Sequence, residues 1–184
     1  MSRKRVLATV AVASVTAVLI AASPQWHDKA TSVQTFVTDV NSANFGNVTV
    51  CFKASGLDDA LGLAPVTLAA GAGSTATARC RNNGGNCPEA ANKFDTSGLS
   101  VTENFPIRNG QTTGCITLSV PVPADFCPSQ QGTNGQTPVL IAVDYENLTL
   151  KLGPIPGSDG RTNIVITKSF GTLAAGDPNS CPAP

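Results

Sequence analysis

Short β-favouring runs, separated by Gly, Pro, Asn and Ser, follow one another through most of this chain. In one of them Val48, Val50 and Phe52 fall on the same face of an extended strand, and further on Ile116 and Leu118 alternate with hydroxyl residues. Period-two alternation of this kind indicates a sheet that is buried on one side. The clearest runs cover residues 33–40, 47–53, 65–70, 74–80, 99–105, 114–120, 139–144 with 147–152, and 163–170.

Turn residues between these runs predict how they connect. Asn109-Gly110 lies between the runs 99–105 and 114–120. Asn-Gly favours a tight hairpin because both turn positions need a positive φ. We therefore expect those two runs to pair antiparallel. Gly71-Ala72-Gly73 predicts another hairpin turn.

About eight short antiparallel strands with this spacing predict an all-β fold, a β-sandwich of immunoglobulin-like or Greek-key type. No stretch beyond the N-terminal apolar run shows a helical stripe. Residues 54–63 have room for one short helical turn, with the acidic pair Asp58-Asp59 near its start, where acids are favoured.

The N-terminus has the pattern of a secretory signal peptide. Three cations at positions 3 to 5 precede an uncharged run from Val6 to Ala22 that ends in small residues. This pattern predicts export with cleavage after Ala22. An uncleaved membrane anchor is the alternative, but the run of 17 residues is at the short end of what spans a bilayer and is rich in Ala and Thr.

The predicted organisation is a signal peptide over 1–22, a polar lead-in over 23–30, one β-sandwich domain over 31–170, and a Gly- and Pro-rich tail over 171–184 tethered by Cys181. Cleavage leaves 9 of the 12 basic residues against 12 acidic ones, a net charge of about −3, with no basic cluster. Such a chain lacks the electrostatic footprint of a nucleic-acid or anionic-lipid binder. After cleavage we expect no membrane span.

An even number of cysteines in an exported chain predicts up to three disulfides. Zinc binding and thiol redox chemistry are disfavoured, because the only histidine is His27 and no C-x-x-C spacing occurs. Spacing alone does not choose among the possible pairings. The six cysteines are Cys51, Cys80, Cys87, Cys115, Cys127 and Cys181.

Four segments carry distinctive short motifs: 51–57, 76–93, 126–130 and 139–150. They contain the patterns CFKxxGL and CxNNGGNxPxAxNK, then Phe126-Cys127-Pro128-Ser129-Gln130, which is close to the form FxCPxxQ, and then a strand of the form VLxxVxYxNxxL. In these motifs, over about Val48 to Leu152, the chain resembles a group of small secreted microbial β-rich proteins of unknown function. The resemblance implies a secreted β-rich domain and no particular activity.

The resemblance also implies one disulfide, Cys80–Cys127, since these positions match the most recurrent cysteines of the group. Cys51–Cys115 and Cys87–Cys181 are then expected to accompany it. A competing bond, Cys80–Cys87, would close a short loop, from which the entropic stabilisation is smaller.

The most unusual polar feature is a Gly-rich loop between two cysteines. Arg81, Asn82, Asn83 and Asn86 place a guanidinium and three amides on it. We regard these four residues as candidates for hydrogen bonding to a sugar or peptide. The alternative is a tight surface turn in which Asn and Gly supply left-handed backbone positions.

Two carboxylates, Asp144 and Glu146, flank the only tyrosine at the end of a predicted strand. Alternation puts them on one face, where they could form a glycosidase-type pair. Solvent-facing strand residues or calcium ligands are the alternatives. A Ser-His-Asp mechanism is disfavoured, because His27 lies outside the predicted core and no G-x-S-x-G motif occurs. No metal site or cofactor motif is predicted.

These observations favour an exported, non-enzymatic binding or surface-associated module whose partner is an extracellular ligand or cell-surface component. A structural subunit that self-associates through strand edges is the first alternative. A hydrolase that uses carboxylates such as Asp144 and Glu146 is the second. Asn47-Val48-Thr49 and Asn147-Leu148-Thr149 also match the N-glycosylation sequon.

Overall fold

The computed structural model describes residues 23–87, 92–123, 126–127, 136–156 and 163–182, so the predicted signal peptide lies outside the described residues. The fold is all-β, as predicted, with two short 3-10 helices at Asp28–Ala30 and Asp59–Leu61. The strands are β1 (Gln25–Trp26), β2 (Ser32–Phe36), β3 (Val48–Ser55), β4 (Leu63–Ala69), β5 (Thr75–Arg81), β6 (Asn92–Asp95), β7 (Ser100–Pro106), β8 (Gln111–Leu118), β9 (Thr137–Tyr145), β10 (Thr149–Pro156), β11 (Asn163–Ser169) and β12 (Leu173–Gly176).

The smaller sheet has β3 at its centre. β8 pairs with β3 along its whole length, from Val48↔Leu118 to Ser55↔Gln111. β1 and β2 therefore share the opposite edge of β3, and every pairing in this sheet is antiparallel.

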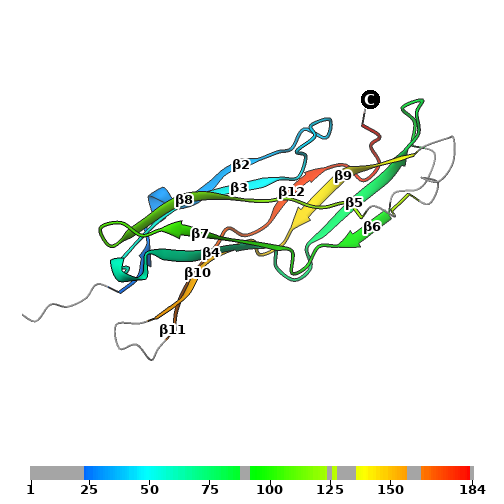
Figure 1. Ribbon diagram of the computed structural model, residues 1–184. Helices are drawn as coiled ribbons and strands as arrows, with labels where there is room; N and C mark the ends of the chain where they lie inside the picture. Colours follow the sequence, from blue (N-terminus) through cyan, green and yellow to red (C-terminus); the bar gives the residue numbers. More distant parts are fainter. Residues whose placement is uncertain (1–22, 88–91, 124–125, 128–135, 157–162, 183–184) are drawn as a thin grey trace, which may run out of the picture.

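The other eight strands form two four-stranded antiparallel sheets with matching strand order, β11-β10-β4-β7 and β12-β9-β5-β6. We describe them together as the two halves of the larger sheet. Along the chain β4 leads into β5, β6 into β7, β9 into β10 and β11 into β12. Figure 1 shows the two halves following each other along the length of the molecule. Four long strands are thus each interrupted once, which is why the structure has 12 strands where about eight were expected.

The interruptions lie on one line across the larger sheet, at residues 70–74, 96–99, 146–148 and 170–172. Hydrogen bonds continue across this line: the Gly71 N–H donates to the Glu146 carbonyl at 2.9 Å. Ser74 is fully buried, and its hydroxyl accepts from the Glu146 N–H at 2.9 Å and donates to the Glu146 carbonyl at 3.2 Å. The hairpin predicted at Gly71-Ala72-Gly73 is wrong, because β4 and β5 do not pair with each other.

When each interrupted strand is counted once, the chain order of the strands identifies the topology. The two-residue β1 only extends the edge of β3, and seven strands remain without it. The first, second and fifth of these, β2, β3 and β8, make the smaller sheet, and the other four make the larger one. Division of seven strands into sheets of three and four is the arrangement of an immunoglobulin-like sandwich, and here the fourth strand pairs with the third. The predicted sandwich is confirmed.

The core lies between the two sheets. Each fully buried aliphatic or aromatic side chain there contributes about 1.5–3 kcal/mol to stability. Phe52 and Phe105 meet edge-on with ring centroids 4.8 Å apart, and a Cβ on Gly114 would overlap the Phe105 ring, so this glycine admits the ring. Facing positions of β3, β4 and β10 supply Val48, Val50, Phe52, Ala54, Val66, Leu68, Leu150 and Leu152.

A tight turn forms at Asn109-Gly110, with φ values of 52° and 69°. The pairing predicted from it is nevertheless wrong: β7 pairs with β4, whereas β8 pairs with β3. The turn carries the chain from the larger sheet to the smaller one, because the apolar sides of both strands are buried in the core between the sheets. Only Arg108 and Gln111 bridge across it.

Three disulfides are present, Cys51–Cys115, Cys80–Cys127 and Cys87–Cys181, which are the expected pairs. The first joins directly opposed residues of β3 and β8. The second ties the end of β5 to Cys127, and the third ties the loop after β5 to the C-terminal segment. The rival Cys80–Cys87 bond does not occur.

Both peripheral segments of the predicted organisation belong to the sandwich. The lead-in 23–30 contributes β1, and Trp26 packs edge-on against Phe52 with ring centroids 5.8 Å apart. At the other end β12 pairs with β9, so the domain boundary predicted at residue 170 falls too early. Antiparallel backbone pairing with β3 and β9 makes these short segments part of the fold, although their sequences are polar or Gly-rich.

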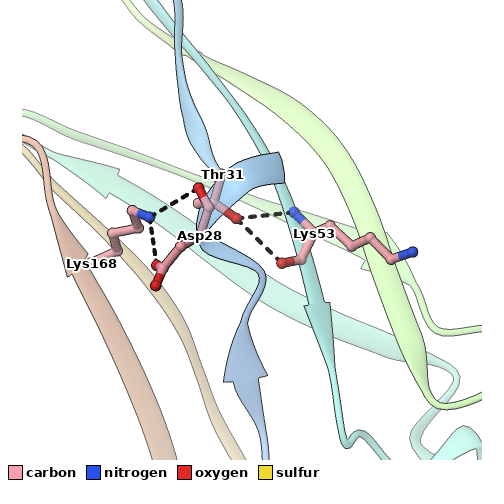
Figure 2. A network of polar contacts seen from close by, with 4 residues as sticks. All are labelled: Asp28, Thr31, Lys53 and Lys168. Atoms are coloured by element: carbon pink, nitrogen blue, oxygen red, sulfur yellow. Dashed lines mark hydrogen bonds and ion pairs between the residues drawn. The ribbon is translucent and has the colours of Figure 1, made fainter.

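A polar network holds the lead-in in place (Figure 2). Lys168 on β11 donates to the Asp28 carboxylate at 2.7 Å. The Thr31 hydroxyl accepts from the Lys53 N–H and donates to the Lys53 carbonyl, both at 3.3 Å. The segment between β1 and β2 therefore joins the edge of the smaller sheet to β11 of the larger one.

Candidate binding groove at the loop end of the sandwich

Asn82, the first amide of the predicted binding loop, holds that loop together. Its Oδ1 accepts from the backbone N–H groups of Gly84 and Asn86, both at 3.0 Å. Its own N–H donates to the Asn86 carbonyl at 2.9 Å. An asparagine oxygen that accepts two bonds from its own loop has no remaining lone pair for a ligand. Asn82 therefore acts as a turn former.

The structure separates the other three candidates. Asn83 and Asn86 are exposed at the tip of the loop. Arg81 is the last residue of β5 and lines a groove that contains none of the three asparagines. Of the four predicted residues, Arg81 alone lines this groove.

This loop-end groove has a volume of about 610 Å³. It opens between the β2–β3 loop and the beginning of β9. Its lining comes from residues 40–45, Asn47, Arg81, Ser119, Val120, Val122, residues 138–140 and Pro182. The volume is within the range of small-molecule sites. The groove thus collects segments that are far apart in the sequence.

The groove lining combines neutral polar groups with apolar side chains. Arg81 is the only ionisable side chain among its described residues. Neutral amides and hydroxyls beside apolar walls can hydrogen-bond a polar ligand while burying its less polar parts. The polar groups come from Asn41, Ser42, Asn44, Asn47 and Ser119, and the apolar ones from Val40, Phe45, Val120, Val122, Pro138, Val139 and Leu140.

Tyr145 holds the β2–β3 loop in place from the core. The side chain is fully buried, and its hydroxyl donates to the Gly46 carbonyl at 2.9 Å. Gly46 has φ 80°, and a Cβ there would touch the side chain of Val143, so the loop needs glycine at this point. Burial raises the pKa of the Tyr145 phenol, which keeps it a neutral donor.

The sequence analysis did not identify residues 41–46 as candidate binding residues. It considered Asn47 as part of a glycosylation sequon and not as a binding residue. A signal was present, because Asn-Ser-Ala-Asn-Phe-Gly-Asn between two strand runs is typical of a polar loop. Its position beside Arg81 follows from the packing of the β2–β3 loop on β9, which no local pattern encodes.

The two carboxylates around Tyr145 do not share a groove. Asp144 lines a second groove on the larger sheet, and Glu146 is not part of that lining. Glu146 follows the end of β9, and a Cβ on Gly73 would touch its carboxylate. A glycosidase pair has to flank one cleft, so this arrangement gives the hydrolase hypothesis no support.

The remaining predicted acidic residues support the backbone. Asp58 caps the second 3-10 helix by accepting from the Ala60 N–H at 2.9 Å, as its position before the helix led us to expect. Asp59 accepts from the Gly110 N–H at 2.9 Å and so braces the Asn109-Gly110 turn. Among the described residues no group of three or more His, Cys, Asp or Glu side chains is placed to hold a metal ion.

Comparison of the chain with protein-family models, with curated proteins and with solved structures found no match. In the described part of the chain no helix is long and apolar enough to cross a membrane. The geometry of the loop-end groove is therefore the basis for assigning a function.

Proposed function

We propose that the chain is an exported, non-enzymatic binding module and that the loop-end groove is its binding surface. The observation that carries this proposal is the convergence of residues 40–47, Arg81 and residues 138–140 at one end of the sandwich. Loops positioned by a rigid scaffold are where immunoglobulin-like domains bind their partners.

Covalent bonds close to the groove support the proposal. Cys80, which precedes Arg81, is bonded to Cys127. Cys181, which precedes Pro182, is bonded to Cys87. Chain segments restrained in this way lose little conformational freedom when a ligand binds, and preorganisation raises affinity.

Two features support export. Disulfides persist in oxidising compartments, and this chain has all six cysteines paired. In addition, the first strand begins at Gln25, so cleavage after Ala22 would leave every described strand intact. Together with the signal-peptide pattern, these features favour action outside the cell.

The lining predicts the class of ligand. Several neutral amide and hydroxyl groups with one guanidinium suit an extracellular ligand rich in hydroxyl and amide groups, which describes a cell-surface glycan. This assignment is tested by probing a glycan array with the protein that remains after cleavage behind Ala22. Saturable binding to at least one glycan is the expected result.

Variants then place the ligand in the groove. Asn44→Ala and Arg81→Ala each remove hydrogen-bonding groups from the lining and should weaken binding about three- to tenfold. Asn83→Ala is the matched control, because this amide is exposed outside the groove. An equal loss in the control, or no binding to any glycan, would contradict the proposal.

Self-association through strand edges is the alternative, and the β11 edge weighs against it. Lys168 points inward from this strand and is bonded to Asp28, with 21% of its side chain exposed. Inward-pointing charge on an edge strand opposes pairing with another chain. Light scattering at increasing concentration should give a constant monomer mass; growth of the mass with concentration would instead favour assembly.

A further inference from the structure

A second groove, here called the outer-face groove, lies on the half of the larger sheet formed by β12, β9, β5 and β6. Its volume is about 570 Å³. Two cross-strand rows form its floor, Thr75–Asp144–Ala174 and Thr77–Ala142–Gly176. Apart from Asp144, these side chains are small, so the floor is flat enough for the aliphatic stem of a long side chain to lie on it.

Asp144 is the one carboxylate in this floor. Its Oδ1 is shielded from solvent and accepts no hydrogen bond from the described residues. A buried charged oxygen without a partner costs free energy, and such atoms are rare in folded proteins. Because the negative charge is shared by both carboxylate oxygens, a cationic donor that enters from the groove would compensate it.

Asp95 shows that the missing partner is particular to Asp144. Asp95 occupies the other end of the same row, across Thr75. It is exposed, and its Oδ1 accepts from the Ser97 N–H at 2.7 Å. Hydrogen bonding by the Ser97 side chain, and then by its backbone N–H, lowers the pKa of Asp95. Two carboxylates that flank one threonine therefore differ in their hydrogen bonding.

Lys93 is the only cation that lines the outer-face groove among the described residues, and it does not pair with Asp144. It lies on β6, opposite Thr77, with β5 between it and β9. Strands lie about 4.8 Å apart, so the backbones of β6 and β9 are separated by roughly 10 Å. Among the described residues, no cation therefore compensates the charge of Asp144.

We propose that the outer-face groove binds an arginine side chain of a partner protein, with its guanidinium on Asp144 and its stem on the Thr and Ala floor. A guanidinium suits the site better than an ammonium, because it is planar, weakly hydrated and forms strong charge-assisted hydrogen bonds with a carboxylate. This site is separate from the loop-end groove, and neither proposal depends on the other.

The test is an NMR titration of the isotope-labelled protein with the peptide acetyl-Gly-Gly-Arg-Gly-Gly-amide. A second peptide with citrulline in place of arginine has nearly the same shape and no charge. The arginine peptide should give saturable shifts at the amides of Ala142, Asp144 and Ala174. The citrulline peptide should bind at least about tenfold more weakly, since it lacks the charge-assisted bonds.

Three variants make the result specific. Asp144→Asn keeps the shape and should weaken arginine binding about tenfold, whereas Asp95→Asn removes the same charge nearby and should leave it unchanged. Ala174→Leu, at an exposed position of β12, should also weaken binding by filling the floor. Equal shifts with citrulline, undiminished binding by a folded Asp144→Asn protein, or no saturable shift in the groove would overturn the proposal.

Discussion

At the scale of single residues, Tyr145 connects the core to the loop-end groove. Its ring is fully buried beside Phe36, with ring centroids 6.1 Å apart, and its hydroxyl reaches the Gly46 carbonyl at 2.9 Å. One oxygen atom therefore links the packing of the larger sheet to the position of the β2–β3 loop. Two measurable consequences follow from this bond.

Tyr145→Phe should lower the free energy of unfolding by about 1–3 kcal/mol, because the Gly46 carbonyl loses its buried donor while the ring is retained. Urea denaturation of the two proteins measures the difference. If the hydroxyl also positions the loop, glycan binding by the variant should weaken. A stability change near zero would show that the bond contributes nothing.

The same residue should make the protein sensitive to alkali. Burial raises the pKa of Tyr145 above its ordinary value of 10.0. The folded state thus holds the phenolic proton more tightly than the unfolded state, so this contribution to stability is complete below pH 10 and is lost as the pH rises through the folded pKa. Denaturation at several alkaline pH values should show a steeper loss for the natural protein than for Tyr145→Phe, and parallel curves would contradict this assignment.

At the scale of elements, the N-terminal strand and the following 3-10 helix close one side of the sandwich. β1 adds to the edge of β3, and the ion pair between Asp28 and Lys168 joins this segment to β11. The Asp28 side chain is 87% exposed, so the pair orients the segment more than it stabilises the fold.

The Asp28–Lys168 pair predicts a shifted titration. The hydrogen bond and charge of Lys168 lower the pKa of Asp28 below its ordinary value of 3.8. The stability that the pair adds is therefore present above pH 3.8 and is lost as the pH falls through the folded pKa. Carboxyl NMR titration should show the pKa of Asp28 returning toward 3.8 in Lys168→Met. An unchanged titration in that variant would mean that Lys168 does not hold Asp28 in solution.

At the scale of the whole molecule, the three disulfides brace different parts of the sandwich. Cys51–Cys115 reinforces two strands that are already paired, whereas Cys80–Cys127 and Cys87–Cys181 restrain chain around the loop-end groove. Stability and binding should therefore respond differently to the loss of each bond.

Replacing Cys80 and Cys127 together with Ser should lower the free energy of unfolding by about 2–5 kcal/mol and also weaken binding in the loop-end groove. The double replacement of Cys51 and Cys115 is the matched control. These pairs are 47 and 64 residues apart, so the entropic terms are similar. The control should lose comparable stability but keep its binding, as measured by denaturation and glycan affinity. An equal loss of binding in both double variants would contradict the specific contribution of Cys80–Cys127 to binding in the loop-end groove.

Local pattern was sufficient for β3 and for the short helical turn after it. The alternation of Val48, Val50 and Phe52 correctly placed β3 and its inner face, and Asp58 correctly marked the start of a helical turn. Pattern failed at Asn109-Gly110, where the turn has the expected backbone but its strands belong to different sheets. A turn sequence specifies its own φ values, whereas the choice of partner strand depends on which arrangement buries more apolar surface.

The sequence by itself determined an all-β, disulfide-bonded sandwich, because side-chain period, turn residues and cysteine number are local or compositional properties. The tertiary structure alone decided that Arg81 joins residues 40–47 in a groove while Asn82 closes its own loop. It also decided that one carboxylate oxygen of Asp144 is buried, whereas Asp95 is exposed. Such differences arise from contacts between segments that are distant in the chain. The local sequence around each residue does not indicate these contacts.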